Sequence, residues 1–314
     1  MQQQIGFCST TDGARIAYAT VGAGPALVVC QPAPTHIELE WEEPRVRDFW
    51  EALGRHHLVV RYDKYGCGLS DRNRTDFSVD PELRTIEAIV EKLGLKSFVL
   101  WGHGGMGAAA AIAYAVKSPN RAAHLILSNA QARWRGAPGF GSVSSDTFRA
   151  LLSDLRMASL SMVERGLGSE FDASAQQWFL RIWREGVTPE ILDELFVAQV
   201  WNIDMRELLP KISLPTLVVH YRNNGSIPFE AGRELAAGIP GARFVPLEGD
   251  THMFYFGDTR PLRRAIAEFL GDPIEEVGRP PLDSAKSPLL PRRRACSAGR
   301  VNSGPLPVGT RCSD

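Results

Sequence analysis

Cysteine is scarce in this sequence, and its spacing suits none of the usual paired roles. Only five cysteines occur in 314 residues, and no two of them stand in a CxxC arrangement. An odd number of widely separated cysteines argues against a disulfide framework and against a zinc site. We therefore predict free thiols in a reducing, cytoplasmic setting, and we expect neither a metal nor another cofactor.

A strong charge of one sign and long apolar runs are also missing. The formal net charge is -1, which creates no field that would attract nucleic acid or an anionic membrane surface. No stretch approaches the roughly 18 to 20 apolar residues of a membrane span. The residues from Met1 to Gly6 lack the basic and apolar regions of a signal peptide. These absences favour an unexported protein with no nucleic-acid or membrane partner.

The pattern that is present consists of short apolar runs alternating with helical stretches. Two alternating segments, 4–9 and 14–21, flank the Asp12-Gly13 turn and predict an opening hairpin. The later runs are Ala26–Cys30, Leu58–Tyr62, Phe98–Trp101, Leu125–Leu127 and Leu217–His220. Runs of this kind are typical of strands buried on both faces. The core is therefore predicted to be an α/β, mostly parallel, doubly wound sheet.

Two regions depart from this pattern. Residues 131–209 show Trp, Leu and Met at helical spacing and no strand signal, which predicts an inserted helical cap within a domain of residues 1–271. Residues 272–314 are rich in Pro, Arg, Ser and Gly, with too few apolar residues to offset the entropy of ordering, so we predict a disordered tail. The run Arg292–Arg294 is expected to be solvated rather than a nucleic-acid patch.

The most informative segment is a dense group of glycines between a buried strand and a helix. Phe98–Trp101 is followed by Gly102-His103-Gly104-Gly105-Met106-Gly107 and then by an alanine-rich run from 108 to 115. Small residues let a strand turn sharply into a helix, and this context is the one in which a nucleophile elbow occurs.

This segment resembles the G-H-S-x-G-G elbow of the α/β-hydrolases, with Gly104 where that family has serine. Three other segments resemble the same family in the expected order: Arg61–Asp71, His36–Pro44 and Leu247–His252. His36–Pro44 is similar to a branch of bacterial hydrolase-like domains joined to cyclase or regulatory modules. The resemblance implies the α/β-hydrolase fold with an N-terminal hairpin and an inserted helical cap.

The resemblance also implies a role for each position of the site. His252 falls where the family has its catalytic histidine, and Asn224 falls where it has the acid. The two oxyanion-hole amides would be those of Gly105 and Ala33. Only His252 of the usual Ser-His-Asp set is therefore present in this sequence.

These replacements remove most of the ordinary chemistry. Loss of a triad nucleophile costs roughly a millionfold in turnover in a related case. Asn224 carries no charge, and replacing the triad aspartate by asparagine costs about ten thousandfold. We expect the side-chain oxygen of Asn224 to accept a hydrogen bond from His252. Ordinary serine-hydrolase chemistry is not expected.

Several other side chains have a structural interpretation. His103 is expected to pack under the turn, Ser70 and Asp71 to fix a loop, and Asp250 to form a turn. Four tryptophans of the predicted cap either line an apolar ligand cavity or form the cap's own core: Trp134, Trp178, Trp183 and Trp201.

Three functions remain open at this point. The first is a non-hydrolytic protein that binds a small apolar or carbonyl-containing ligand. The second is a lyase or cofactor-free oxygenase in which His252 works as general acid or base. The third is a weak hydrolase of small esters or related substrates, with water in the space that Gly104 leaves.

Overall fold

The computed structural model describes residues 1–134, 168, 171–196 and 202–274. Residues Met1–Ile274 form one compact unit. Its strands are β1 Gln4–Ser9, β2 Arg15–Val21, β3 Ala26–Cys30, β4 Leu58–Tyr62, β5 Phe98–His103, β6 Ala122–Ser128, β7 Thr216–Tyr221 and β8 Arg243–Leu247. Its helices are α1 Ile37–Glu42, α2 Pro44–Leu53, α3 Asp80–Lys92, α4 Gly104–Lys117, α7 Ala173–Gly186, α8 Pro189–Glu194, α9 Phe229–Gly238 and α10 Arg260–Leu270, with a 3-10 turn at Leu209–Lys211.

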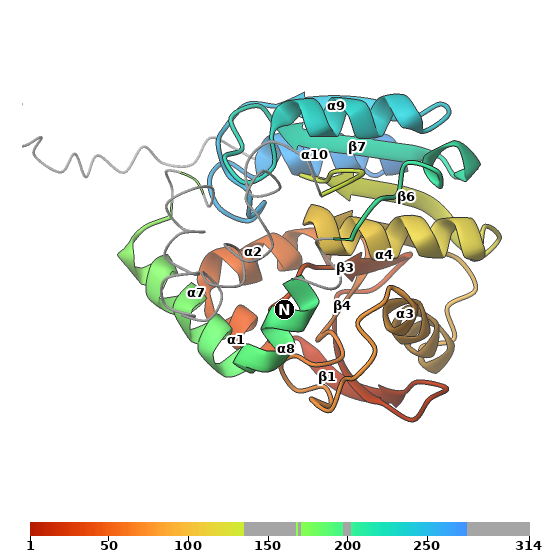
Figure 1. Ribbon diagram of the computed structural model, residues 1–314. Coiled ribbons are helices and arrows are strands. Elements are labelled where there is room, and N and C mark those ends of the chain that lie inside the picture. Colours follow the sequence, from red (N-terminus) through yellow and green to blue (C-terminus); the bar gives the residue numbers. More distant parts are fainter. Residues whose placement is uncertain (135–167, 169–170, 197–201, 275–314) are drawn as a thin grey trace, which may run out of the picture. The chain divides into compact units, whose positions relative to one another are not determined.

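The strands described form a single sheet in the order β1-β2-β4-β3-β5-β6-β7-β8 (Figure 1). β1 pairs antiparallel with β2, and β2 pairs antiparallel with β4. From β4 to β8 every pairing is parallel. The predicted N-terminal hairpin and mostly parallel sheet are thus confirmed.

Helices cover both faces of this sheet. Neighbouring side chains of each central strand point to opposite faces, so each strand contributes to two cores. In β3, Leu27 and Val29 belong to a core that includes residues of α2 and α10. Val28, between them, belongs to a second core with residues of α3, α4 and α9. Continuous apolar runs in the sequence are the consequence of burial on both faces.

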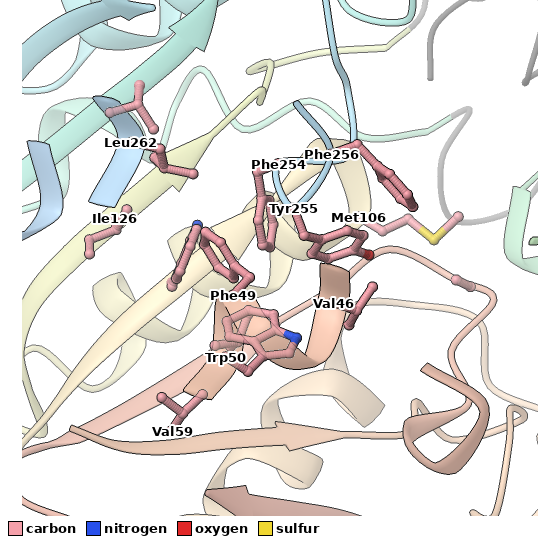
Figure 2. Close-up of a cluster of buried hydrophobic side chains, with 14 of the residues drawn as sticks. Val46, Phe49, Trp50, Val59, Met106, Ile126, Phe254, Tyr255, Phe256 and Leu262 are labelled. Atoms are coloured by element: carbon pink, nitrogen blue, oxygen red, sulfur yellow. The ribbon is translucent and has the colours of Figure 1, made fainter. Parts of the chain in front are cut away.

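The core on the α2 side is built around aromatic rings (Figure 2). Phe254, which follows β8, stacks on Trp101 of β5 with ring centroids 4.7 Å apart. Phe49 and Trp50 of α2 approach the Phe254 ring at 5.1 and 5.5 Å. Rings at these distances in stacked and edge-on arrangements bury much apolar surface. The loop after β8 is therefore anchored in the core immediately beyond His252.

The loop after β4 is fixed by the two residues that the sequence singled out. The Ser70 hydroxyl accepts from the Ala17 amide at 2.9 Å and donates to the Asp63 carbonyl at 2.7 Å. The Asp71 carboxylate accepts from the Arg15 amide at 2.8 Å. These bonds tie the loop to strand β2, as expected of a loop-fixing pair.

The predicted cap and tail lie partly outside the described residues. Of residues 131–209, the structure describes helices α7 and α8 with the segments beside them, and 135–167, 169–170 and 197–201 lie outside it. Of residues 272–314, it describes only the first three, so Arg292–Arg294 lies outside it as well. Asp272 accepts a hydrogen bond from His57, with the oxygen 2.7 Å from Nε2.

Helix α4 sits so close to strand β3 that Gly107 has no room for a side chain. A Cβ at Gly107 would overlap the carbonyl oxygen of Cys30. We therefore expect Gly107→Ala to reduce the free energy of unfolding by about 3 kcal/mol or more, because α4 or β3 must move. Urea denaturation measures this change.

Gly105→Ala, two residues earlier in the same helix, is the control. A Cβ there would meet its nearest neighbour, the Trp134 ring, at 3.4 Å, which is ordinary contact. If both variants lose the same stability, close packing of α4 against β3 is not the cause.

Candidate functional site

The site lies where β5 turns into α4. Gly104 is the first residue of α4 and has a φ of 62°, a conformation that glycine adopts without steric cost. A Cβ at Gly104 would lie 3.6 Å from His252 Nε2 and 3.6 Å from Pro32 Cγ. The turn therefore points a residue at this position toward His252, although Gly104 has no side chain to present.

His252 and Asn224 lie together, as the sequence predicted. The Asn224 side-chain nitrogen, Nδ2, is 3.3 Å from His252 Nδ1. The Asn224 oxygen, Oδ1, accepts from the backbone amides of Ser226 at 2.9 Å and Ile227 at 3.1 Å. Because both amides are donors, the oxygen must be the atom that faces them.

This orientation corrects the expected hydrogen bond between Asn224 and His252. The amide nitrogen of Asn224 faces the imidazole and donates to Nδ1, so the oxygen does not accept from His252. A neutral imidazole carries one proton, and when Nδ1 accepts, that proton is on Nε2. The nitrogen that faces Gly104 is therefore a donor.

Two further histidines surround His252, and all three rings stay uncharged. Burial, with a smaller contribution from His220, lowers the pKa of the His252 imidazole to about 3. Burial also holds the pKa of His103 well below its usual value and lowers that of His220. Charging any of these rings would place a cation in an apolar environment. The site is electrically neutral at physiological pH.

His103 has the structural position that the sequence predicted. Its Nδ1 is 3.0 Å from both the carbonyl and the hydroxyl oxygen of Ser128 on the next strand. Its ring packs edge-on against Phe254 at 4.6 Å and lies 5.0 Å from the His252 ring. These contacts hold the His103 side chain against β6 and Phe254, beside the turn from β5 to α4.

Asn129, at the end of β6, is a positioning residue that sequence reasoning missed. Its side-chain nitrogen donates to the carbonyls of His252 at 2.8 Å and Thr251 at 3.2 Å. Its oxygen accepts from the Tyr221 amide of β7 at 3.1 Å. One buried amide therefore joins β6, β7 and the loop that carries His252. Its φ is 46°, a left-handed value that asparagine tolerates.

A cavity of about 100 Å³ opens next to His252 and Gly105. Its described lining is mostly apolar, with one hydroxyl and one imidazole: Pro32, Ala33, Pro34, Gly105, Met106, Trp134, Phe179, Trp183, Phe196, Ser226, Ile227, His252 and Met253. The volume is about two thirds of the roughly 150 Å³ of an apolar cavity that holds benzene. A ligand of a few carbon atoms fits.

The predicted oxyanion-hole residues, Ala33 and Gly105, both line this cavity. Gly105 belongs to the first turn of α4, where amides have no acceptor within the helix. No side chain caps this end of α4, and its first turn contains no acidic residue. The helix terminus therefore offers hydrogen-bond donors and partial positive charge to the cavity.

Of the four tryptophans of the predicted cap, two line the cavity, which is one of the predicted roles, and a third contacts α1 outside the cap, which is neither of them. Trp134 and Trp183 line the cavity, whereas the indole of Trp178 donates to the Leu39 carbonyl at 2.8 Å and so holds α7 to α1. Trp201 lies outside the described residues.

Neither a metal centre nor a membrane span is found in the part of the chain that the structure describes. No three His, Cys, Asp or Glu side chains there are grouped to hold a metal ion. No helix there has the length and apolarity needed to cross a bilayer.

A family model described as "alpha/beta hydrolase fold" matches residues 25–259. This chain belongs to the α/β-hydrolase family. The match spans the elbow, Asn224 and His252 in the order seen in the structure. Within the family, the narrower bacterial branch suggested by His36–Pro44 stays a prediction.

Two relatives of this chain carry the word hydrolase in their names. It is 26% identical over 219 residues to "AB hydrolase superfamily protein YisY" of Bacillus subtilis, covering 67% of this chain and 80% of that one. It is 24% identical over 237 residues to "2-hydroxy-6-oxononadienedioate/2-hydroxy-6-oxononatrienedioate hydrolase 2" of Pseudomonas putida, covering 71% and 80%.

Solved structures of other α/β-hydrolases share the fold. A hydrolase from Pseudomonas aeruginosa has a TM-score of 0.72 at 22% identity, covering 85% of this chain and 98% of that one. An enol-lactonase from Burkholderia xenovorans has a TM-score of 0.72 at 19% identity, covering 85% and 100%. At these identities the likeness concerns the fold alone.

Removal of the Asn129 side chain should loosen the site. Asn129→Ala leaves the Tyr221 amide and the two carbonyls of the histidine loop without their partner, so we expect a loss of about 2 to 4 kcal/mol in the free energy of unfolding. Urea denaturation gives the value. Asn223→Ala, at an exposed position near Asn224, should stay within about 0.5 kcal/mol of wild type. Equal effects would contradict a tethering role for Asn129.

The depressed pKa of His252 predicts a loss of stability in acid. In the unfolded chain the imidazole takes a proton below about pH 6.5, whereas in the folded protein it stays neutral down to about pH 3. The unfolded state therefore gains protons as the pH falls through this window, which destabilises the fold by about 1.4 kcal/mol per pH unit.

Comparison of wild type with His252→Gln isolates this contribution. Between pH 8 and pH 5, the free energy of unfolding of wild type should fall by about 2 kcal/mol more than that of His252→Gln. Urea titrations at both pH values measure the difference. Parallel pH profiles for the two proteins would show that His252 titrates normally in the fold.

Proposed function

We propose that this protein binds a small apolar or carbonyl-containing molecule and does not hydrolyse it. The observation that carries the proposal is the contact from Asn224 Nδ2 to His252 Nδ1 at 3.3 Å. It leaves the proton on Nε2, the nitrogen 3.6 Å from the Cβ position of Gly104. A general base must accept a proton at that point, and an N–H cannot.

The missing nucleophile supports the same proposal. Covalent hydrolysis needs a hydroxyl or thiol at the elbow, and Gly104 and its neighbours Gly105, Met106 and Gly107 supply neither. The cavity is lined mostly by apolar side chains, and Gly105 in the uncapped first turn of α4 lies beside it. Such a cavity is suited to holding a ligand by burial and a few hydrogen bonds.

We also propose a cytoplasmic location. Cys8, Cys30 and Cys67 are buried free thiols, and thiols of this kind persist in a reducing compartment.

Hydrolysis by water is the alternative that one observation favours. The nearest atoms to a Cβ at Gly104 lie 3.6 Å away, so a water molecule has room beside His252. The named hydrolases among the relatives support the same chemistry. This mechanism needs His252 to present a lone pair at Nε2, and so does a lyase or cofactor-free oxygenase in which His252 is the base. The donor orientation of Asn224 disfavours both.

Cleavage of short p-nitrophenyl esters tests the proposal. Wild type and His252→Ala should cleave acetate and butyrate esters at the same background rate. Gly104→Ser/Asn224→Asp should gain turnover, because a carboxylate at position 224 draws the histidine proton to Nδ1 and frees Nε2 to activate the serine.

The single variant Gly104→Ser is the matched control for this gain. It supplies the hydroxyl but keeps the donor at Nε2, so its turnover should be about ten thousandfold below that of the double variant. Wild-type turnover that disappears in His252→Ala would contradict a non-hydrolytic function and support the water mechanism.

A further inference from the structure

The space over Gly104 is bordered by a hydrogen-bond donor rather than by a base. The Nε2 atom of His252, which carries the proton, is 3.6 Å from the Cβ position of Gly104, so it is directed at the place that a serine side chain would fill. Asn224 keeps Nε2 as the donor. Its oxygen accepts from the amides of Ser226 and Ile227, so only its nitrogen is available to face Nδ1 of His252.

Two other residues that line this cavity carry backbone N–H groups. The Gly105 amide stands in the uncapped first turn of the 14-residue helix α4, and Ala33 also lines the cavity. An acceptor in the ligand would complement these groups.

Two buried indole N–H groups lack an acceptor, and this observation is independent of His252 and Asn224. Trp134 and Trp183 both line the cavity, and their side chains are 8% and 2% exposed. The Nε1 atom of each is buried and has no hydrogen-bond partner among the described residues. Buried indole N–H groups usually have a partner. The Trp134 ring lies 3.4 Å from the Cβ position of Gly105, beside the uncapped end of α4.

The described lining of the cavity includes hydrogen-bond donors but no charged side chain to match an anion. Its described lining contains no Lys, Arg, Asp or Glu, and burial keeps His252 neutral by lowering its pKa to about 3. A buried carboxylate without a cation is strongly disfavoured, whereas a carbonyl oxygen needs only donors. A hydroxyl in the same place would bring a proton for which His252 has no lone pair.

We propose that His252, held as an Nε2–H donor by Asn224, binds an uncharged carbonyl oxygen in the space over Gly104. The ligand is then a small apolar ketone, ester or amide rather than the corresponding acid or alcohol. This inference rests on the proposed function, since a hydrolase would need the opposite tautomer. It makes Asn224 a positioning residue for ligand binding.

Asn224→Asp reverses the polarity of His252 with almost no change in shape. The carboxylate oxygen that replaces Nδ2 accepts instead of donating, so the proton moves to Nδ1 and Nε2 becomes an acceptor. The probes are acetone, 2-propanol and acetate, which have the few carbon atoms that the cavity admits. Binding is measured by calorimetric titration at pH 8, above the ordinary pKa of an imidazole. Asn223→Asp adds the same charge at the exposed neighbouring position and is the matched control.

Wild type and Asn223→Asp should bind acetone at least tenfold more tightly than the alcohol or the carboxylate. In Asn224→Asp, the affinity for acetone should fall at least tenfold and the order of ketone and alcohol should reverse. A thermal melt of each variant shows whether it is folded. Equal affinities for ketone and alcohol in wild type, or no effect of Asn224→Asp, would overturn the inference while leaving non-hydrolytic binding intact.

Nitrogen-15 spectra of the histidine rings provide a readout that needs no ligand. Wild type should show a protonated Nε2 in His252 at pH 8, and Asn224→Asp should show a protonated Nδ1. A proton on Nδ1 in wild type would overturn the inference. Failure of all three probes to bind would overturn the inference together with carbonyl binding, whereas His252-dependent ester cleavage by wild type would overturn the proposed function itself.

Discussion

The close approach of helix α4 to strand β3 is the constraint on which the site depends. Gly107 lies against the Cys30 carbonyl with no room for a Cβ, and this contact seats the first turn of α4 at the carboxyl end of the central strands. From there Gly105 and Met106 reach the cavity. The left-handed φ of Gly104 then follows, because the chain must turn within one residue from strand to helix. The fold thus keeps the geometry of an elbow without its side chain.

The position of His252 is determined by two separate contacts of its loop. The Phe254 ring stacks on Trp101, so the loop cannot move without opening the aromatic core. Asn129 binds the His252 carbonyl. Since neither contact involves the imidazole, the backbone of the histidine is fixed independently of its protonation. Among the described residues, Asn224 decides which nitrogen of His252 carries the proton. Its amide oxygen is held by two backbone N–H groups.

The parts of the fold that could be predicted from the sequence are those that produce a local pattern of residue types. Buried strands such as Ala26–Cys30 appear as continuous apolar runs, and the elbow appears as a group of glycines. The role of Asn129 could not be predicted, because it depends on three segments that meet only in the fold. The orientation of the Asn224 side-chain amide toward His252 was wrongly predicted for a similar reason. Nothing in the sequence shows that the backbone amides of Ser226 and Ile227 face its oxygen.

The two departures at positions 104 and 224 act on the same atom. If glycine at 104 stood opposite a histidine paired with a carboxylate, Nε2 would be a lone pair facing an open space, an arrangement suited to activating water. Asparagine at 224 preserves the acceptor needed by Ser226 and Ile227 and changes only the group that faces Nδ1. The loop therefore keeps its shape while Nε2 becomes a donor. With both residues in place, the Nε2 atom offers a hydrogen bond at the position where a base would remove a proton.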